Sequence, residues 1–206
     1  WGDSKSKVQM VLTSSNGSTY ERDINIRNLE NSDDGDKSLI TFNKPLDVKG
    51  TAFLTYSHIN KPDEQWIYLP AVKRTKRISS KNKSGPFMGS EFSYEDMSPF
   101  EYEEFEFTYL REEELNGEVC FVVEQRPKDR YSGYSKRVVW VDKSEYRIHK
   151  VDFYDRKNDL LKTLNNKNYK LYLNKYWRQG VSEMVNHKTS KSTKLNWIDY
   201  QFGNNF

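Results

Sequence analysis

The chain has one cysteine, three histidines and no long hydrophobic run among its 206 residues. A single cysteine excludes an intrachain disulfide, and Cys120 lies in the apolar stretch 119–123, where a buried inert thiol is favoured over a nucleophile. The longest apolar runs have four or five residues, far short of the about 20 that a membrane-spanning helix requires. His58, His149 and His187 lie far apart without partners at metal-ligand spacing, so we predict no metal site and no cofactor.

Motifs of the common catalytic sites are also missing. The sequence contains no P-loop, no G-x-G-x-x-G and no G-x-S-x-G nucleophile elbow. Asp63 and Glu64 follow Pro62, where a polar turn explains the two acids better than a catalytic carboxylate pair does. A Ser-His-Asp arrangement stays open on sequence alone, because its members need not be close in sequence. We predict that the protein is not an enzyme and has no catalytic residues.

Aromatic and alternating side chains are what the sequence has in abundance. Aromatic residues make up 15% of the chain, and they suit the pleated, half-buried surface of a sheet. Residues 8–12, 20–26 and 105–109 alternate between apolar and polar, and Asn16-Gly17 and Asn116-Gly117 are typical hairpin turns. About eleven or twelve short strands at close spacing predict a barrel or a strongly curved antiparallel sheet. We expect residues 1–206 to form one domain.

Residues 73–117 have the least regular pattern. A run of basic residues at 73–83 is followed by many acidic residues up to 114, and we expect adjacent blocks of opposite sign to fold against one another. Ser93, followed by Glu95 and Asp96, has the pattern of a helix N-terminus. Basic and aromatic residues in the C-terminal third suit a single-strand groove. Their aromatics recur at strand spacing, however, so we predict no nucleic-acid partner.

An ordered set of segments resembles the bacterial outer-membrane lipoprotein-sorting family, in its LolA-like branch. The set opens with PLDVKGTAFL at 45–54 and PDEQWIYLPA at 62–71, and continues with VKRTKRIS at 72–79 and FMGSEFSYED at 87–96. Later matching pieces are Cys120, RPKD at 126–129, YSK at 134–136, WVD at 140–142, YD at 154–155 and LKT at 161–163. The resemblance covers essentially the whole chain.

The resemblance implies a mainly β (α+β) fold, an incomplete and strongly curved antiparallel β-barrel with a few short helices covering its concave face, as in LolA, LolB and LppX. It also implies a non-enzymatic periplasmic carrier that binds acyl chains of lipoproteins or other lipids in an apolar cavity, for transport across the envelope to the outer membrane. The expected partners are an inner-membrane exporter and an outer-membrane acceptor. The alternative is an adaptor of an envelope export system, using an exposed sheet edge or the charged residues 73–114.

The beginning of the chain departs from that family pattern. Relatives normally carry a helix ahead of the first strand, whereas here the first alternating stretch begins almost at once. We therefore expect a mature or trimmed chain without its signal peptide, in which that N-terminal helix is either missing or disordered.

The strand predicted at residues 65–69 supplies four candidate ligand-binding residues, because it carries large side chains on both faces. Trp66 and Tyr68 share one face, and Ile67 and Leu69 share the other, so only one of the two pairs can line a cavity.

Further candidates come from the segments on either side of that strand. Phe53 and Leu54, in the strand predicted at 51–56, complete the ligand-binding set. Arg74 and Arg77 are candidates for contact with an anionic headgroup or partner. Pairing of the two arginines with the acids that follow them is an equally favoured alternative.

Overall fold

The computed structural model describes residues 2–206, and strands make up most of them. The first six strands are β1 (Asp3–Thr13), β2 (Thr19–Leu29), β3 (Lys37–Lys44), β4 (Ala52–Tyr56), β5 (Glu64–Leu69) and β6 (Arg74–Ile78). After a long connection come β7 (Phe105–Leu115), β8 (Glu118–Pro127), β9 (Tyr134–Asp142), β10 (Ile148–Asp155) and β11 (Leu160–Lys167). A small separate hairpin, β12 (Lys170–Tyr172) and β13 (Tyr176–Arg178), precedes β14 (Val181–Asn186) and β15 (Ser192–Phe202).

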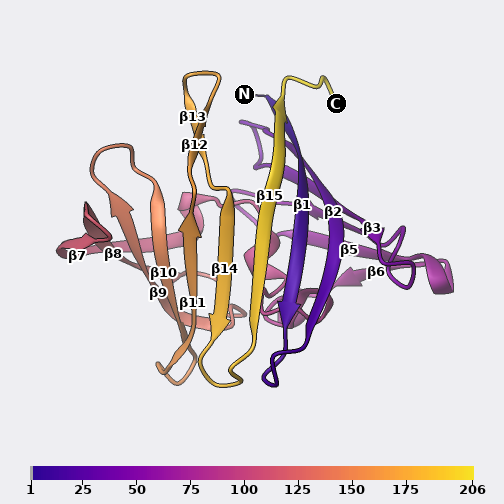
Figure 1. The fold of residues 1–206 in the computed structure, drawn as a ribbon, viewed down its shortest axis with the longest axis horizontal. Helices are drawn as coiled ribbons and strands as arrows, with labels where there is room; N and C mark the ends of the chain where they lie inside the picture. The colour runs from indigo at the N-terminus through magenta and orange to yellow at the C-terminus, as the bar shows by residue number, and fades with distance from the viewer. Residues whose placement is uncertain (1) are drawn as a thin grey trace.

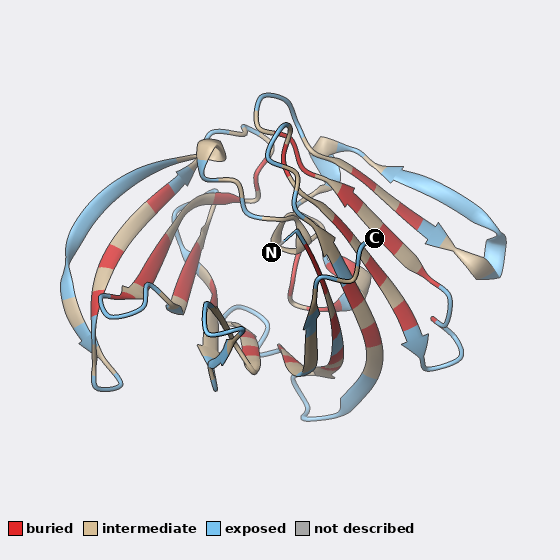
Figure 2. Ribbon diagram, turned by 90° about the horizontal axis from the view of Figure 1, so that it is seen from above, coloured by how far each residue is buried: buried red, intermediate tan, exposed pale blue. Residues whose placement is uncertain are grey.

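Thirteen of these strands form one sheet in the order β6-β5-β4-β3-β2-β1-β15-β14-β11-β10-β9-β8-β7. Every neighbouring pair is antiparallel. The sheet is not closed, because β6 and β7 end it at opposite edges. Its two wings bend to the same side and give the molecule the shape of an arch (Figures 1 and 2). The predicted strongly curved antiparallel sheet is thereby confirmed.

Local turns and one long-range pairing build this sheet. The hairpin turns predicted at Asn16-Gly17 and Asn116-Gly117 are present, with φ of +85° at Gly17 and +84° at Gly117, backbone that glycine adopts at little cost. Strands β1 and β15, from opposite ends of the chain, pair from Ser4↔Phe202 to Thr13↔Ser192. This pairing joins an N-terminal series of hairpins to a C-terminal one in the middle of the sheet.

The helical content of the described residues is limited to single turns. These are five 3₁₀ turns: η1 (Pro70–Val72), η2 (Ser80–Asn82), η3 (Phe87–Gly89), η4 (Glu95–Met97) and η5 (Tyr102–Glu104). The helix expected after Ser93 is therefore only η4, where Asp96 Oδ2 accepts hydrogen bonds from the Ser93 backbone N–H and hydroxyl, both at 2.7 Å. Pro99 follows closely and disfavours helical backbone at the residue before it. Within residues 2–206, no helix is long and apolar enough to cross a membrane.

The connection at residues 79–104 runs from β6 at one sheet edge to β7 at the other, on the side toward which the wings curve (Figure 1). We call the sheet face that it contacts the inner face. Gln65 of β5 donates a 2.9 Å hydrogen bond to Tyr94 O, and Lys162 of β11 donates one of 2.9 Å to Glu91 O. Phe87 is fully buried, with its ring 5.1 Å from the Phe53 ring. The connection thus forms part of the core.

The main core consists of alternate inner-face side chains together with aromatic residues of the connection. Figure 2 shows the buried positions recurring along the strands. Its fully buried members include Val8, Met10, Ile24, Ile40, Phe42, Phe53, Phe87, Val139 and Met184. A smaller cluster joins Cys120, Val122, Val138 and Trp140, so the only cysteine is buried, as predicted.

Residues 73–117, the segment with the least regular pattern, contain two strands, and the alternation at 105–109 predicted one of them. Residues 74–78 form β6, a strand whose residues 74–77 are exposed, and residues 105–115 form β7. The sequence pattern did not reveal β6, because an edge strand with basic side chains on both faces shows no apolar alternation.

Candidate functional site

Two neighbouring cavities lie between residues 92–100 and the inner face. The first, about 230 Å³, includes Arg137 and Val139 of β9 in its wall, and we call it the β9 cavity. The second, about 370 Å³, includes Leu195 and Trp197 of β15, and we call it the β15 cavity. Residues that line both are Phe92, Asp96, Ser98, Pro99, Phe100, Leu164 and Asn166. The two cavities therefore lie on either side of one short stretch of chain.

Strand register gives the β9 cavity an apolar floor. Val139 pairs with Val151, Val151 with Leu164, and Leu164 with Met184. Side chains at directly opposed positions of antiparallel strands stand on the same face, so these four form one row across β9, β10, β11 and β14. All four line the cavity. The β15 cavity continues the apolar wall with Ile26, Ile40, Leu195 and Trp197.

An exposed aromatic surface adjoins the β9 cavity. Phe105 lines the cavity, and strand alternation places Phe107 and Tyr109 on the same face of β7. Phe107 is 47% exposed and Tyr109 is 59% exposed. Phe100 stacks on Phe105 with ring centroids 5.3 Å apart, and Phe121 of β8 lies 6.4 Å from Tyr109. Apolar surface therefore extends from the cavity along the β7 wing.

A buried polar cluster anchors the connection between the cavities. The Lys162 ammonium lies 2.7 Å from Asp96 Oδ2, with both side chains 5% exposed. The Tyr134 hydroxyl donates to the same carboxylate at 2.8 Å. Burial alone would raise the pKa of Asp96, but the Lys162 charge and the Ser93 hydrogen bonds outweigh it and lower that pKa. Asp96 is thus held as an anion against the sheet.

The end of the β9 cavity near η5 carries several further charged groups. Lys83 and Asp129 form an ion pair of 2.7 Å. Burial, followed by the Asp63 charge, raises the pKa of Glu104 to about 7. Burial also raises the pKa of Asp63 and of Glu95. Glu104 is consequently less ionised near neutral pH than a carboxyl in water.

The six predicted ligand-binding residues divide between the two faces of the sheet, as strand alternation requires. Phe53 and Ile67 belong to the sealed core, with 1% and 4% exposure, and Leu69 packs against it. On the outer face, Trp66 contacts Tyr56 edge-on at 5.6 Å. Leu54, which pairs with Trp66, and Tyr68 share that outer face. None of the six lines the β9 or the β15 cavity, and their contact with a ligand stays a prediction.

The two predicted headgroup contacts, Arg74 and Arg77, lie on the edge strand β6. Arg77 Nη2 donates a 2.8 Å hydrogen bond to Glu64 Oε1, and its guanidinium lies 6.0 Å from the Trp66 ring centroid. Arg77 is therefore paired locally, but with Glu64, which precedes it in the chain, and not with the acids that follow, as the alternative on sequence had it. A role of either arginine in binding a headgroup or partner stays a prediction.

The sequence pattern did not identify the residues that line the cavities, although one segment indicated an apolar face beside them. Residues 105–109 place their aromatic side chains on one face and acids or threonine on the other. In a strand at the edge of a sheet, such a face is either covered or offered to a ligand. The floor row carries no local signal, because it is assembled from four strands.

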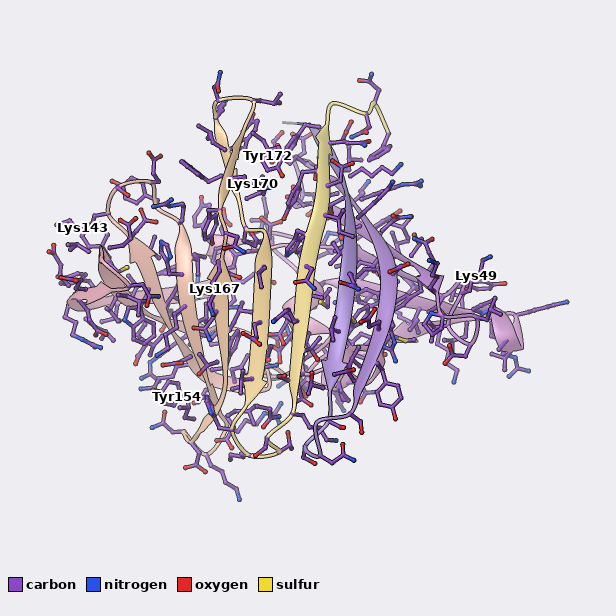
Figure 3. The ribbon with its side chains drawn as sticks, in the orientation of Figure 1. Lys49, Lys143, Tyr154, Lys167, Lys170 and Tyr172 are labelled. Atoms are coloured by element: carbon purple, nitrogen blue, oxygen red, sulfur yellow. The ribbon has the colours of Figure 1, made fainter. Side chains whose placement is uncertain are left out.

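The described chain also contains a hollow of about 420 Å³ beneath the β12–β13 hairpin, with Arg147, Tyr169 and Trp177 in its wall. The hairpin, which bears Lys170 and Tyr172, projects past the end of the sheet (Figure 3). Trp177 Nε1 donates a 2.9 Å hydrogen bond to Glu145 and secures one side of the hairpin. Nowhere between residues 2 and 206 do three His, Cys, Asp or Glu side chains gather as a metal ion would require.

Comparison with known proteins identifies similar chains of the same fold. An outer membrane lipoprotein-sorting protein domain from Vibrio parahaemolyticus is 54% identical, with all of this chain aligned to 87% of that one at a TM-score of 0.98. A DUF1329 family protein from Desulfovibrio piger is 28% identical over all of this chain and 87% of its own, with a TM-score of 0.93. A LolA superfamily protein from Nitrosomonas europaea, 20% identical over 98% of this chain and 86% of its own, shares the fold at a TM-score of 0.79.

Searches by sequence add one match. A family model described as an uncharacterized protein matches residues 34–206. No curated protein sequence matches the chain. The fold is shared with the LolA superfamily protein, and the 54% identity to the Vibrio domain over the full chain shows that the chain belongs to the family of outer-membrane lipoprotein-sorting proteins.

Proposed function

We propose that the protein is a periplasmic carrier that binds an acyl chain of a lipoprotein or another lipid in the β9 and β15 cavities, for transport across the envelope to the outer membrane. The main observation is the row of apolar side chains on the floor of the β9 cavity, which lies beside the exposed aromatic surface of β7. The β15 cavity shares Phe92, Phe100 and Leu164 with it. Membership of the lipoprotein-sorting family supports the same function. The carrier works without catalysis or a cofactor.

Burial of an acyl chain supplies the binding free energy. An acyl chain of about 14–16 carbons gains roughly 0.8 kcal/mol for each buried CH₂. Even partial enclosure therefore supports binding in the micromolar range after the costs of association. The exposed rings of Phe107 and Tyr109 receive whatever part of the chain the cavities do not enclose.

In this proposal, the residues predicted on β4 and β5 act indirectly. Phe53, Ile67 and Leu69 pack against the connection, and thereby hold residues 92–100 at the distance from the sheet that leaves the cavities open. Trp66 and Tyr68, on the opposite face, are available to a partner protein. The proposed partners are an inner-membrane exporter that delivers the lipid and an outer-membrane acceptor that receives it.

A substitution that fills the cavities tests the proposal. Leu164 lines both cavities, so Leu164→Trp places an indole where the acyl chain would lie. We expect saturable binding of a fluorescent fatty-acid analogue to the wild type at about one site, and binding to the variant weaker by about tenfold or more. Leu46→Trp is the matched control, since Leu46 is 86% exposed in a loop. Thermal unfolding of each variant is measured in parallel, because overpacking alone costs about 1–3 kcal/mol.

Lipid extraction of the purified protein, followed by mass spectrometry, complements the binding measurement. A folded wild type that shows neither saturable binding nor co-purified lipid would refute the carrier function. The open edges of β6 and β7 would then favour an adaptor that pairs with partner strands.

The basic edge strand β6 gives a separate prediction. Reversing Arg74 and Arg77 to Glu should weaken binding to vesicles of anionic lipid at low salt, where electrostatic attraction is least screened. Reversing Lys167, the last residue of β11, and Lys170, the first of β12, is the matched control with the same change in net charge. Equal vesicle binding by the Arg74/Arg77 variant and the wild type would assign Arg77 to its local pair with Glu64.

A further inference from the structure

Arg137 is a cation in the wall of the β9 cavity, and two of its three guanidinium nitrogens are buried donors that the protein leaves without a partner. Its Nε and Nη2 atoms are buried and have no hydrogen-bond partner among residues 2–206. Among residues 2–206, no other arginine or lysine has a buried side-chain nitrogen without a hydrogen-bond partner. Buried donors are normally hydrogen-bonded, since leaving them unpaired is unfavourable. An unpaired guanidinium in a cavity wall therefore indicates a ligand that accepts its hydrogen bonds.

The two aromatic rings beside Arg137 determine which side of its guanidinium group is open to a ligand. Its guanidinium carbon lies 4.1 Å from the Phe105 ring centroid and 5.6 Å from that of Phe100. Stacking on a ring occupies the face of a guanidinium and leaves the donors in its plane available for a planar anion. On the sheet, Arg137 is opposite Phe153, one row away from the apolar floor of Val139 and Val151. A cationic group and an apolar floor thus adjoin within one cavity.

The other charged groups of the β9 cavity are already engaged or partly neutral. Lys83 is paired with Asp129, and Lys162 is paired with Asp96. Glu95 accepts hydrogen bonds from the Ser132 hydroxyl and the Gly133 N–H, both at 2.8 Å. Burial favours the neutral forms of the two remaining acids in the wall, Asp63 and Glu104. Arg137 is consequently the group best placed to attract an anion.

We propose that Arg137 binds an anionic group, a carboxylate or a phosphate, at the end of an acyl chain whose hydrocarbon lies on the Val139–Met184 row. This inference rests on the proposed carrier function and narrows its cargo to acidic lipids. The Arg137 donors hydrogen-bond the anion, while Phe100 and Phe105 shield the ion pair from water. A neutral acyl ester or alcohol would leave the guanidinium without an anionic partner.

Three ligands with the same hydrocarbon chain test the inference: dodecanoic acid, dodecyl phosphate and dodecanol. The affinity of each is measured by displacement of a fluorescent fatty-acid analogue, at a pH where both acids are ionised. For the wild type we expect at least one of the two anions to bind about tenfold tighter than the alcohol, or more, as charge-assisted hydrogen bonds provide. Preference for the carboxylate or for the phosphate distinguishes a fatty-acid cargo from a phospholipid cargo. In Arg137→Gln the affinity for the anions should fall to that for the alcohol, whose own affinity stays the same.

Arg126→Gln is the matched control, because Arg126 is an exposed arginine of the neighbouring strand β8 that pairs with Glu124 at 2.7 Å. This variant should keep the preference for anions. If Arg137→Gln does not fold, Arg137→Lys keeps the charge without the planar fork and should bind the anions more weakly than the wild type. Equal wild-type affinity for all three ligands, or an undiminished preference in the Arg137 variant, would overturn the inference and leave the carrier function standing. Binding of none of the three would overturn the inference, and together with the absence of co-purified lipid it would overturn the carrier function as well.

Discussion

Glu104 is a residue in the wall of the β9 cavity whose ionisation is altered by its place in the fold. Burial, the Asp63 charge and, more weakly, the charges of Glu101 and Asp129 raise its pKa to about 7, while Lys83 acts in the opposite direction. In the unfolded chain the same carboxyl titrates near its ordinary value of 4.5. The folded protein therefore holds an extra proton between these two values, and its stability should fall as pH rises through that window.

Glu104→Gln tests this pH dependence, because glutamine stays neutral at every pH. We expect the variant to gain stability over the wild type at about pH 8 and to show little difference at about pH 5, measured by thermal unfolding. Glu106→Gln, at an exposed position of β7, serves as the control and should leave the pH profile unchanged. Parallel profiles of the wild type and Glu104→Gln across this range would contradict the raised pKa.

At the scale of elements, the connection between β6 and β7 has two parts with different roles. Phe87 is fully buried, and its ring lies 5.9 Å from Phe42 and 5.1 Å from Phe53. Phe100, at the other end, is 55% exposed and lines both cavities. The first part fills the concave side of the β1–β5 wing, and the second leaves the β7–β10 wing open.

Two matched truncations separate these roles. Phe87→Ala should destabilise the protein by about 3–5 kcal/mol, the usual cost of removing a buried aromatic ring. Phe100→Ala should cost less than about 1 kcal/mol in unfolding, since its ring is largely in water, yet should weaken binding of a fatty-acid analogue. Chemical unfolding and ligand titration of both variants provide the measurements. Similar losses of stability in the two variants would show that the connection acts as one structural unit.

The whole molecule is an open sheet that is joined at its centre by the pairing of the first and last strands. Strand β1 has partners on both sides, β2 and β15, and its side chains Val8 and Met10 are fully buried. The edge strands β6 and β7 have one partner each and mostly exposed side chains. Local opening is easiest where few buried contacts resist it.

Hydrogen exchange measured along the native chain should follow this difference. We expect the backbone amides of β1 and β15 to be the slowest, and those of β6, β7 and the β12–β13 hairpin to exchange first. Addition of a fatty-acid analogue should slow exchange in β7 and residues 92–104 more than in β1, because binding stabilises the segments that contact the ligand. Uniform protection across all strands would be inconsistent with an open-edged sheet.

The sequence by itself determined the class of fold. Period-two alternation at residues 8–12 and 105–109 and the Asn-Gly turns identified hairpins, because alternation and turn geometry are local properties of the chain. The single buried Cys120 was likewise readable from its apolar neighbours. Residues 45–96 carried enough specific segments to indicate the LolA-like family before the fold was seen.

Only the tertiary structure decided where the cavities lie. Alternation placed Ile67 and Trp66 on opposite faces of β5, but the burial of Ile67 under the connection depends on residues some 20 positions later in the chain. The floor of the β9 cavity takes one residue from each of β9, β10, β11 and β14. The buried Arg137 nitrogens lack a partner because the nearby acids pair with other groups. Such features arise from strand order and register across the sheet, which no local pattern encodes.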